Sequence, residues 1–109
     1  MDKDEFRRQM DAFNAEYRAS LPGKLREVDE LWKRMHADAA RPEDSAELLR
    51  RLHTLAGSAK TFGFPELGTA ARAAENYLEP YTRQGVMPPV AEREEFGRLL
   101  GMLRQCASV

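Results

Sequence analysis

Two histidines and one cysteine are the side chains of this sequence most suited to nucleophilic chemistry or to binding a transition metal. His36 and His53 fall on different predicted helices, and no carboxylates accompany them in the spacing of a metal-ligand motif. The single cysteine, Cys106, excludes an internal disulfide and a metal site built from several cysteines. No serine or cysteine forms a catalytic arrangement with a histidine. We therefore predict no metal site, and we interpret His36 as a helix-end residue and Cys106 as a small helix residue.

His53 lies in a helical segment but outside the apolar stripe of that segment. The predicted helix begins at Asp44 or Ser45, and at about 100° per residue its main apolar side chains fall within ~40° of one direction. These apolar residues are Leu48, Leu52, Leu55, Ala59 and Phe62. His53 lies near ~140° on the same helical wheel. We therefore expect its imidazole to face solvent and not the core.

The neighbours of His53 on this face suit a phosphoryl group. Gly57 lies near ~180°, and a mid-helix glycine costs ~1 kcal/mol relative to alanine, so its missing side chain indicates close approach by another molecule. The alternative is close packing between two helices, which the position of Gly57 away from the core disfavours. A histidine with the ordinary pKa of about 6.5 is mostly neutral at pH 7, which leaves one ring nitrogen nucleophilic. Arg50 and Lys60 flank the histidine, and the stem of Lys60 could bring its ammonium back toward the imidazole. The alternative is that both cations are ordinary solvated charges.

Five amphipathic helices are predicted to position these residues. Isoleucine is absent, and no stretch alternates apolar and polar residues as a half-buried strand would. Besides the stripe of the His53 helix, the predicted stripes are Phe6, Met10, Phe13 and Tyr17; Leu25, Val28, Trp32, Met35 and Ala39; Leu67, Ala71, Ala74, Leu78 and Tyr81; and Val90, Phe96, Leu99, Leu100 and Leu103. The predicted breaks are Leu21–Gly23, Ala40–Pro42, Gly63, Pro80 (which should end or kink its helix near Glu79), and the loop Thr82–Pro89. The expected fold is all-α, an antiparallel four-helix bundle with one additional flanking helix, the first or the last.

The composition is that of one globular domain over residues 1–109. The 17 basic and 18 acidic residues nearly balance, which argues against nucleic acid or an anionic membrane surface as the main partner. Hydrophobic residues make up 42%, too many for a disordered chain. No apolar run approaches the ~20 residues of a membrane span, and the acidic N-terminus is unlike a secretory signal. We therefore expect a cytoplasmic protein.

From Leu52 to Gly63 the chain reads Leu-His-Thr-Leu-Ala-Gly-Ser-Ala-Lys-Thr-Phe-Gly. This stretch resembles the signature of histidine-containing phosphotransfer (Hpt) domains, in which His-x-Leu-Lys-Gly-Ser is followed by a glycine and another amphipathic helix. The overall pattern covers about residues 6 to 81, and residues 53 to 63 are its specific part. The matching positions are His53 for the phosphorylated histidine, Leu55 for the core leucine, Gly57 for the glycine beneath the imidazole, Ser58 for the small polar residue and Gly63 for the helix-ending glycine.

One position departs from the pattern of the family. Hpt domains often have a lysine three residues after the histidine, and this chain has Ala56 there. The resemblance implies that this lysine normally sits beside the phosphoryl group. Lys60 is one turn further along the chain, and we interpret it as a possible substitute.

The resemblance implies a histidyl phosphorelay. A response-regulator receiver domain, or the receiver of a hybrid sensor histidine kinase, would pass its phosphoryl group from an aspartate to His53, which then delivers it to another receiver. The resemblance suggests the imidazole nitrogen further from the backbone as the acceptor. The chain would be a stoichiometric phosphocarrier and not an independent enzyme, without a cofactor of its own, because the Mg²⁺ would belong to the receiver.

A shallow apolar surface beside His53 is the predicted docking patch. It comprises Leu49, Ala46, Ala56 and Gly57, with Arg50 and Lys60 around it. Leu49 lies near ~100° on the wheel, off the core stripe. We therefore expect Leu49→Asp to weaken receiver binding without unfolding the chain, which we expect to be a monomer.

Two other function classes stay open. The first is an Hpt-like adaptor that binds receiver or kinase domains without carrying phosphate, a reading that Ala56 makes plausible. The second is a small helical enzyme with His53 as a general base, for which the sequence offers no second catalytic group. Replacing His53 separates the classes, because a phosphocarrier loses transfer while an adaptor still binds.

Overall fold

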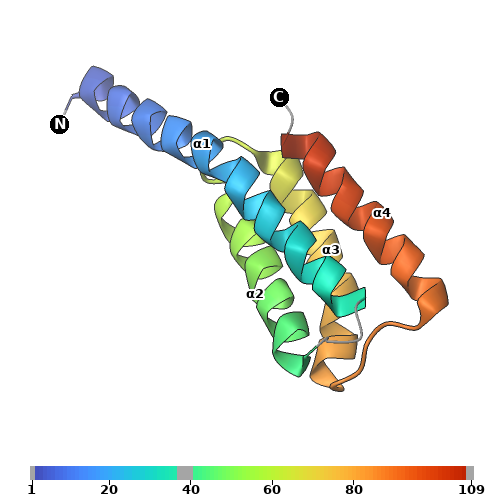
Figure 1. Ribbon diagram of the computed structural model, residues 1–109. Coiled ribbons are helices and arrows are strands. Elements are labelled where there is room, and N and C mark those ends of the chain that lie inside the picture. Colours follow the sequence, from blue (N-terminus) through green and yellow to red (C-terminus); the bar gives the residue numbers. More distant parts are fainter. Residues whose placement is uncertain (1, 37–40, 108–109) are drawn as a thin grey trace.

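The computed structural model describes residues 2–36 and 41–107, and four helices account for nearly all of them (Figure 1). The helices are α1 (Lys3–His36), α2 (Pro42–Ser58), α3 (Pro65–Arg83) and α4 (Val90–Ala107). They pack as a bundle, so the all-α prediction is confirmed. The prediction of an additional flanking helix is wrong for the described residues, because the first two predicted helices form one continuous helix.

α1 continues through the predicted break at Leu21–Gly23. Leu21 is buried and lies on the same stripe as the core residues on either side of it, which are Tyr17, Val28, Leu31 and Met35. Pro22 faces solvent within the helix, where its ring removes one backbone hydrogen bond. Packing of the uninterrupted stripe outweighs that local cost. Ala39 and Ala40, which were assigned to the end of the second predicted helix and the following break, lie outside the described residues.

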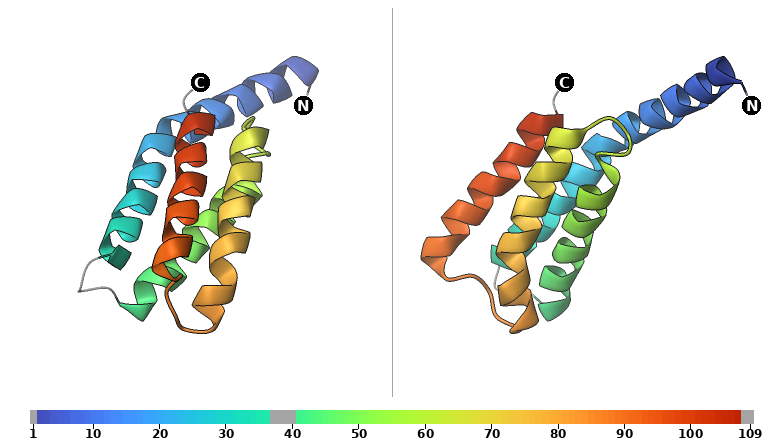
Figure 2. Two further views of the ribbon diagram at one scale, coloured as in Figure 1. Left: turned by 90° about the vertical axis from the view of Figure 1, so that its right-hand side faces the viewer. Right: turned by 180° about the vertical axis from the view of Figure 1, so that it is seen from behind.

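The N-terminal part of α1 projects beyond the other helices (Figures 1 and 2). Phe6 and Phe13, predicted as core residues, are 57% and 52% exposed, and Tyr17 is the first buried side chain of the helix. The predicted core role of these two phenylalanines is therefore wrong. With 34 residues, α1 is twice as long as the 17-residue α2, so α2 cannot cover its whole length.

α2 and α3 lie side by side in the bundle, joined by a tight connection at Gly63. α2 begins at Pro42, within the predicted break and earlier than the predicted start at Asp44 or Ser45. Asp44 supports this start, because its carboxylate accepts a hydrogen bond from the backbone N–H of Arg41 and pairs with Arg34. α2 ends at Ser58, earlier than predicted, and Gly63 turns the chain with a φ of 92°, a conformation that favours glycine. The antiparallel α3 then returns along α2.

α3 passes through Pro80 instead of ending near Glu79. Leu78 packs in the core just before the proline, and the Thr82 hydroxyl bonds the Ser45 hydroxyl of α2 at 2.7 Å just after it. These contacts hold the last turn of α3 on the bundle, so the predicted stop at Glu79 is wrong.

The core is built mainly from the predicted stripes. α3 packs against both α2 and α4, and its alanines let these neighbours approach closely. The buried members of the stripes around it are Leu48, Leu52, Leu55 and Ala59; Leu67, Ala71, Ala74 and Leu78; and Phe96, Leu100 and Leu103. Val90 is 77% exposed, so its predicted place in the core is wrong, and Phe62, Tyr81 and Leu99 are half-buried. This packing fixes the facing surfaces of α2 and α3, where the candidate site lies.

Candidate functional site

His53 lies two-thirds of the way along α2, and its side chain is 67% exposed. Leu52, directly before His53, and Leu55, two residues after it, are both buried. The backbone that carries the imidazole is therefore anchored in the core. The prediction that His53 faces solvent is confirmed. An exposed ring on an anchored helix can meet a reacting group of another protein without rearrangement of the bundle.

Glu75 of α3 holds one edge of the imidazole. Its Oε2 lies 2.6 Å from His53 Nδ1, and its side chain is only 10% exposed. An ionised carboxylate only accepts hydrogen bonds, so this contact places the proton on Nδ1 and leaves the lone pair on Nε2. In its neutral form the ring is therefore held with its nucleophilic nitrogen away from Glu75.

Arg72 binds the other oxygen of the same carboxylate. Its Nη1 lies 2.5 Å from Glu75 Oε1, and its side chain is 48% exposed. Glu75 thus has a partner on each oxygen, as a largely buried carboxylate requires. His53, Glu75 and Arg72 form a continuous chain of polar contacts across the α2–α3 interface, which we call the histidine triad.

The sequence analysis missed Glu75 and Arg72. Counting from the α3 stripe, Glu75 lies near ~80° on the wheel, at the edge of the buried face. That position indicates a partly covered carboxylate, but it does not say which residue of which helix covers it. Finding its contact with His53 requires the pairing of α2 with α3.

Gly57 leaves open space one turn beyond His53. A Cβ added to this glycine would meet nothing within 4 Å, so close packing of helices does not explain the residue. No side chain therefore protrudes from α2 at this position beside the imidazole, which agrees with the predicted approach of another molecule.

Lys60 lies past the end of α2, and its stem crosses α3 at Gly68. A Cβ on Gly68 would come within 2.9 Å of Lys60 Cγ and 3.5 Å of Lys60 Cε. Gly68 is seven residues from Glu75, about 10 Å along α3. The structure thus places the stem of Lys60 against Gly68, about two turns of α3 from Glu75.

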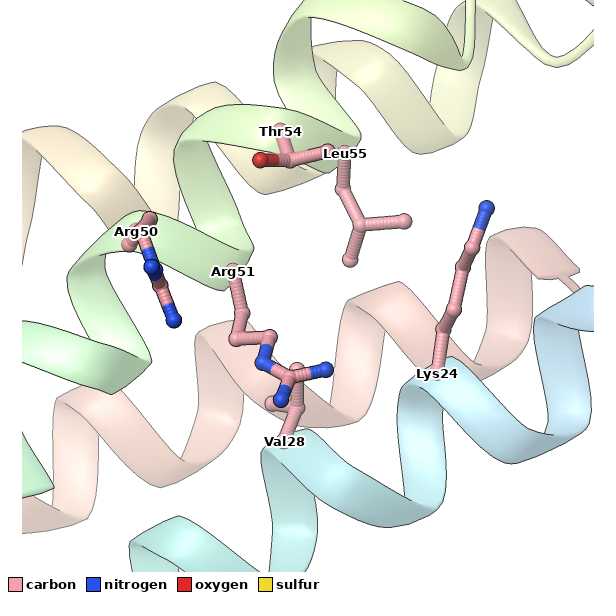
Figure 3. Close-up of a pocket in the computed structure, with 6 residues that line it drawn as sticks. All are labelled: Lys24, Val28, Arg50, Arg51, Thr54 and Leu55. Carbon is pink, nitrogen blue, oxygen red and sulfur yellow. The ribbon is translucent and has the colours of Figure 1, made fainter.

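Arg50 faces the gap between α1 and α2, where it lines a pocket of about 310 Å³ (Figure 3). The other lining residues are Lys24, Val28, Arg51, Thr54 and Leu55. Arg50 pairs with Glu47, and this hydrogen bond is the main cause that lowers the pKa of the Glu47 carboxyl, with Arg51 contributing next. The same contact raises the pKa of Arg50. The charge of Arg50 is thus engaged with Glu47 and not with the histidine triad.

The predicted docking patch divides into exposed and buried residues. Ala46 and Gly57 are exposed, whereas Leu49 is half-buried and packs against the core. Ala56 is only 5% exposed, so its place in the patch is wrong. The physical reason is that α2 contacts α3 as well as α1, which widens the buried arc beyond a single apolar stripe.

The other two candidate residues, His36 and Cys106, lie outside the histidine triad. His36 lies at the end of α1 with Nδ1 2.9 Å from the Trp32 carbonyl oxygen, which confirms it as a helix-end residue. Cys106 is half-buried in α4. Within residues 2–36 and 41–107, no group of three or more histidine, cysteine or acidic side chains is placed to hold a metal ion. Over the same ranges, no helix is both long and apolar enough to cross a membrane.

Comparison with protein families matches residues 13–108 to the Hpt domain. No curated protein and no solved structure matches the chain. Hpt domains carry phosphoryl groups in two-component phosphorelays and interact with receiver domains and kinases. Since the match spans nearly the whole chain, the protein belongs to the Hpt domain family.

Proposed function

We propose that His53 is the phosphoacceptor of a multistep phosphorelay. A receiver domain carrying an aspartyl phosphate docks over α2, and its phosphoryl group moves to His53 and then to the aspartate of a second receiver. The observation that carries this proposal is an exposed imidazole whose Nδ1 is bound by a buried carboxylate. That arrangement presents Nε2 as the nucleophile.

The transfer step exchanges one bond to phosphorus for another. The Nε2 lone pair attacks phosphorus and forms an N–P bond, while the P–O bond to the receiver aspartate breaks and its electron pair leaves with the carboxylate. The proton stays on Nδ1, so the ring becomes positively charged as the N–P bond forms. Glu75 stabilises this charge through a charge-assisted hydrogen bond.

The other requirements for phosphoryl transfer are met partly by this chain and partly by the receiver domain. The chain supplies an anchored nucleophile and an open approach at Gly57, with Ala46 and the exposed part of Leu49 as docking surface. The Mg²⁺ and most of the transfer machinery belong to the receiver, whether that receiver is a response regulator or part of a hybrid sensor histidine kinase. His53 is regenerated when its phosphoryl group leaves, so the chain acts as a phosphocarrier.

The test is phosphoryl transfer from receiver domains charged with radiolabelled acetyl phosphate in the presence of Mg²⁺. The wild type should acquire an acid-labile, base-stable label, and His53→Gln should acquire none. His36→Gln is the matched control, since it removes an exposed histidine on another helix, and it should label normally.

Label that persists in His53→Gln would overturn the proposal. Binding of receivers without any label, by wild type and variant alike, would replace the phosphocarrier with an adaptor. Binding can be measured by isothermal titration calorimetry on the same receiver panel.

A further inference from the structure

Phosphorylation of His53 creates an electrostatic problem at the histidine triad. The phosphoryl group adds negative charge to a ring that already contacts the Glu75 carboxylate at 2.6 Å. The phosphoryl group is carried on Nε2, the ring nitrogen away from Glu75, so the two anionic groups repel each other across the imidazole, and burial of Glu75 reduces the screening of this repulsion by water. A cation beside the ring would offset this repulsion.

The contacts that the structure gives to the cations expected from the sequence are with other residues than the histidine triad. The family lysine is replaced by Ala56, which is buried. Arg50 is paired with Glu47 beside the α1–α2 pocket, and the stem of Lys60 lies on Gly68, about two turns of α3 from Glu75.

Arg72 is the cation that the fold does bring to the imidazole. It lies one turn from Gly68 toward Glu75 on the same face of α3, and a single carboxylate separates its guanidinium from the His53 ring. Its side chain is about half exposed, so solvent reaches part of it while it contacts Glu75.

We propose that Arg72 is the phosphoryl-binding residue of this chain, taking the place of the family lysine absent at position 56. This inference rests on the proposed phosphoacceptor role of His53. One guanidinium has five N–H donors in a planar fork, so Arg72 can keep its contact with Glu75 while other donors bind the phosphoryl oxygens. The cation is thus supplied by α3 across the interface and not by α2.

This role predicts a specific kinetic defect in Arg72→Gln. Single-turnover transfer is measured with the receiver domain that labels the wild type, charged with acetyl phosphate and Mg²⁺. The transfer rate at saturating receiver should fall about five- to tenfold, because charge-assisted hydrogen bonds to the phosphoryl group are lost. The receiver concentration at half-saturation should stay within about twofold, because Arg72 acts on the phosphoryl group and not on docking.

Two further variants test the charge itself. Arg72→Lys should recover part of the rate, since it keeps the charge but loses the bidentate geometry. Arg72→Gln combined with Ala56→Lys should also recover part of it, because the second change restores a cation at the family position. Arg98→Gln is the matched control, since it removes another exposed arginine that pairs with a glutamate three residues away, on α4. It should leave the rate unchanged.

The outcomes separate this inference from the proposed function. Absence of label on His53 in the wild type would overturn both. If the wild type is labelled and Arg72→Gln transfers at the same rate, only the Arg72 inference is overturned. A rate loss that neither lysine variant recovers would also overturn it, because that result assigns Arg72 a role other than supplying charge. Circular dichroism and thermal unfolding establish that each variant compared is folded.

Discussion

At the residue scale, the chemistry of the site depends on which imidazole nitrogen carries the proton. Glu75 decides this through its contact with Nδ1, and in the proposed transfer it would also stabilise the charge that develops on the ring. The family signature contains the histidine but not this carboxylate, which comes from the next helix. The tautomer is therefore a product of the tertiary structure.

Glu75→Gln tests this role of the carboxylate. The amide can still accept a hydrogen bond, but it carries no charge, and a charge-assisted bond is stronger than a neutral one by about 1.5 kcal/mol. We therefore expect transfer to slow about tenfold. Nitrogen-15 NMR of the imidazole should show mainly Nδ1–H in the wild type and a mixture of tautomers in the variant. Glu79→Gln, one turn further along α3 and paired with Arg83, is the control. Equal rates for both variants would contradict the role.

Gly57→Ala separates stability from function at one position. The new Cβ meets nothing, and alanine is favoured over glycine in a helix by about 1 kcal/mol, so the free energy of unfolding should rise by up to that amount. Transfer should slow, because the methyl group occupies the open approach to His53. Urea unfolding and the single-turnover assay measure the two effects.

Gly101→Ala on α4 should give a comparable gain in stability with no loss of transfer. Transfer at the wild-type rate in Gly57→Ala would mean that the receiver does not use this space.

At the scale of the elements, α1 shows how packing outweighs a local helix breaker. Pro22 and Gly23 together resemble a helix stop in the sequence, yet Leu21 and Val28 are both buried on one uninterrupted stripe. α1 bends where its N-terminal part leaves the bundle (Figure 2), and a proline inside a helix is a common cause of such a bend.

Pro22→Ala should therefore stabilise the protein. The substitution restores a backbone N–H to an exposed position, and an interior proline costs a helix ~3 kcal/mol relative to alanine, part of which the bend already relieves. We expect the free energy of unfolding to rise by about 1–2 kcal/mol, measured by urea unfolding with circular dichroism. A loss of stability would instead show that the bend is needed to seat Tyr17 on Phe62, whose rings lie 4.8 Å apart.

Helical periodicity predicted those features that depend on one helix alone. The stripe from Leu48 to Ala59 and the exposure of His53 both follow from a single helical wheel, and both are confirmed. Features that depend on two helices were not predictable in this way. Ala56 is buried because α3 lies over it, and Glu75 reaches His53 because α3 runs antiparallel beside α2. A wheel contains no information about which helix packs on which face.

At the scale of the whole molecule, the part of α1 before Tyr17 contributes no buried side chain to the bundle. The principal dimensions of 54 × 23 × 21 Å reflect this projection. The family match begins at residue 13, close to Tyr17, where α1 first enters the core. Tyr17 connects the helix to the site-bearing region, because its hydroxyl lies 2.9 Å from the Ser58 hydroxyl at the end of α2.

Deleting residues 2–12 should therefore leave the bundle intact. The deleted segment contributes no buried side chain among its described residues, so the thermal midpoint should change by less than about 4 °C and the single-turnover rate should not change. A longer deletion of residues 2–18 removes Tyr17 with its ring contacts to Phe62 and Phe64, and it should destabilise the bundle by about 3 kcal/mol or more. Comparable destabilisation by both deletions, measured by thermal unfolding, would show that the projecting helix supports the bundle in spite of its exposure.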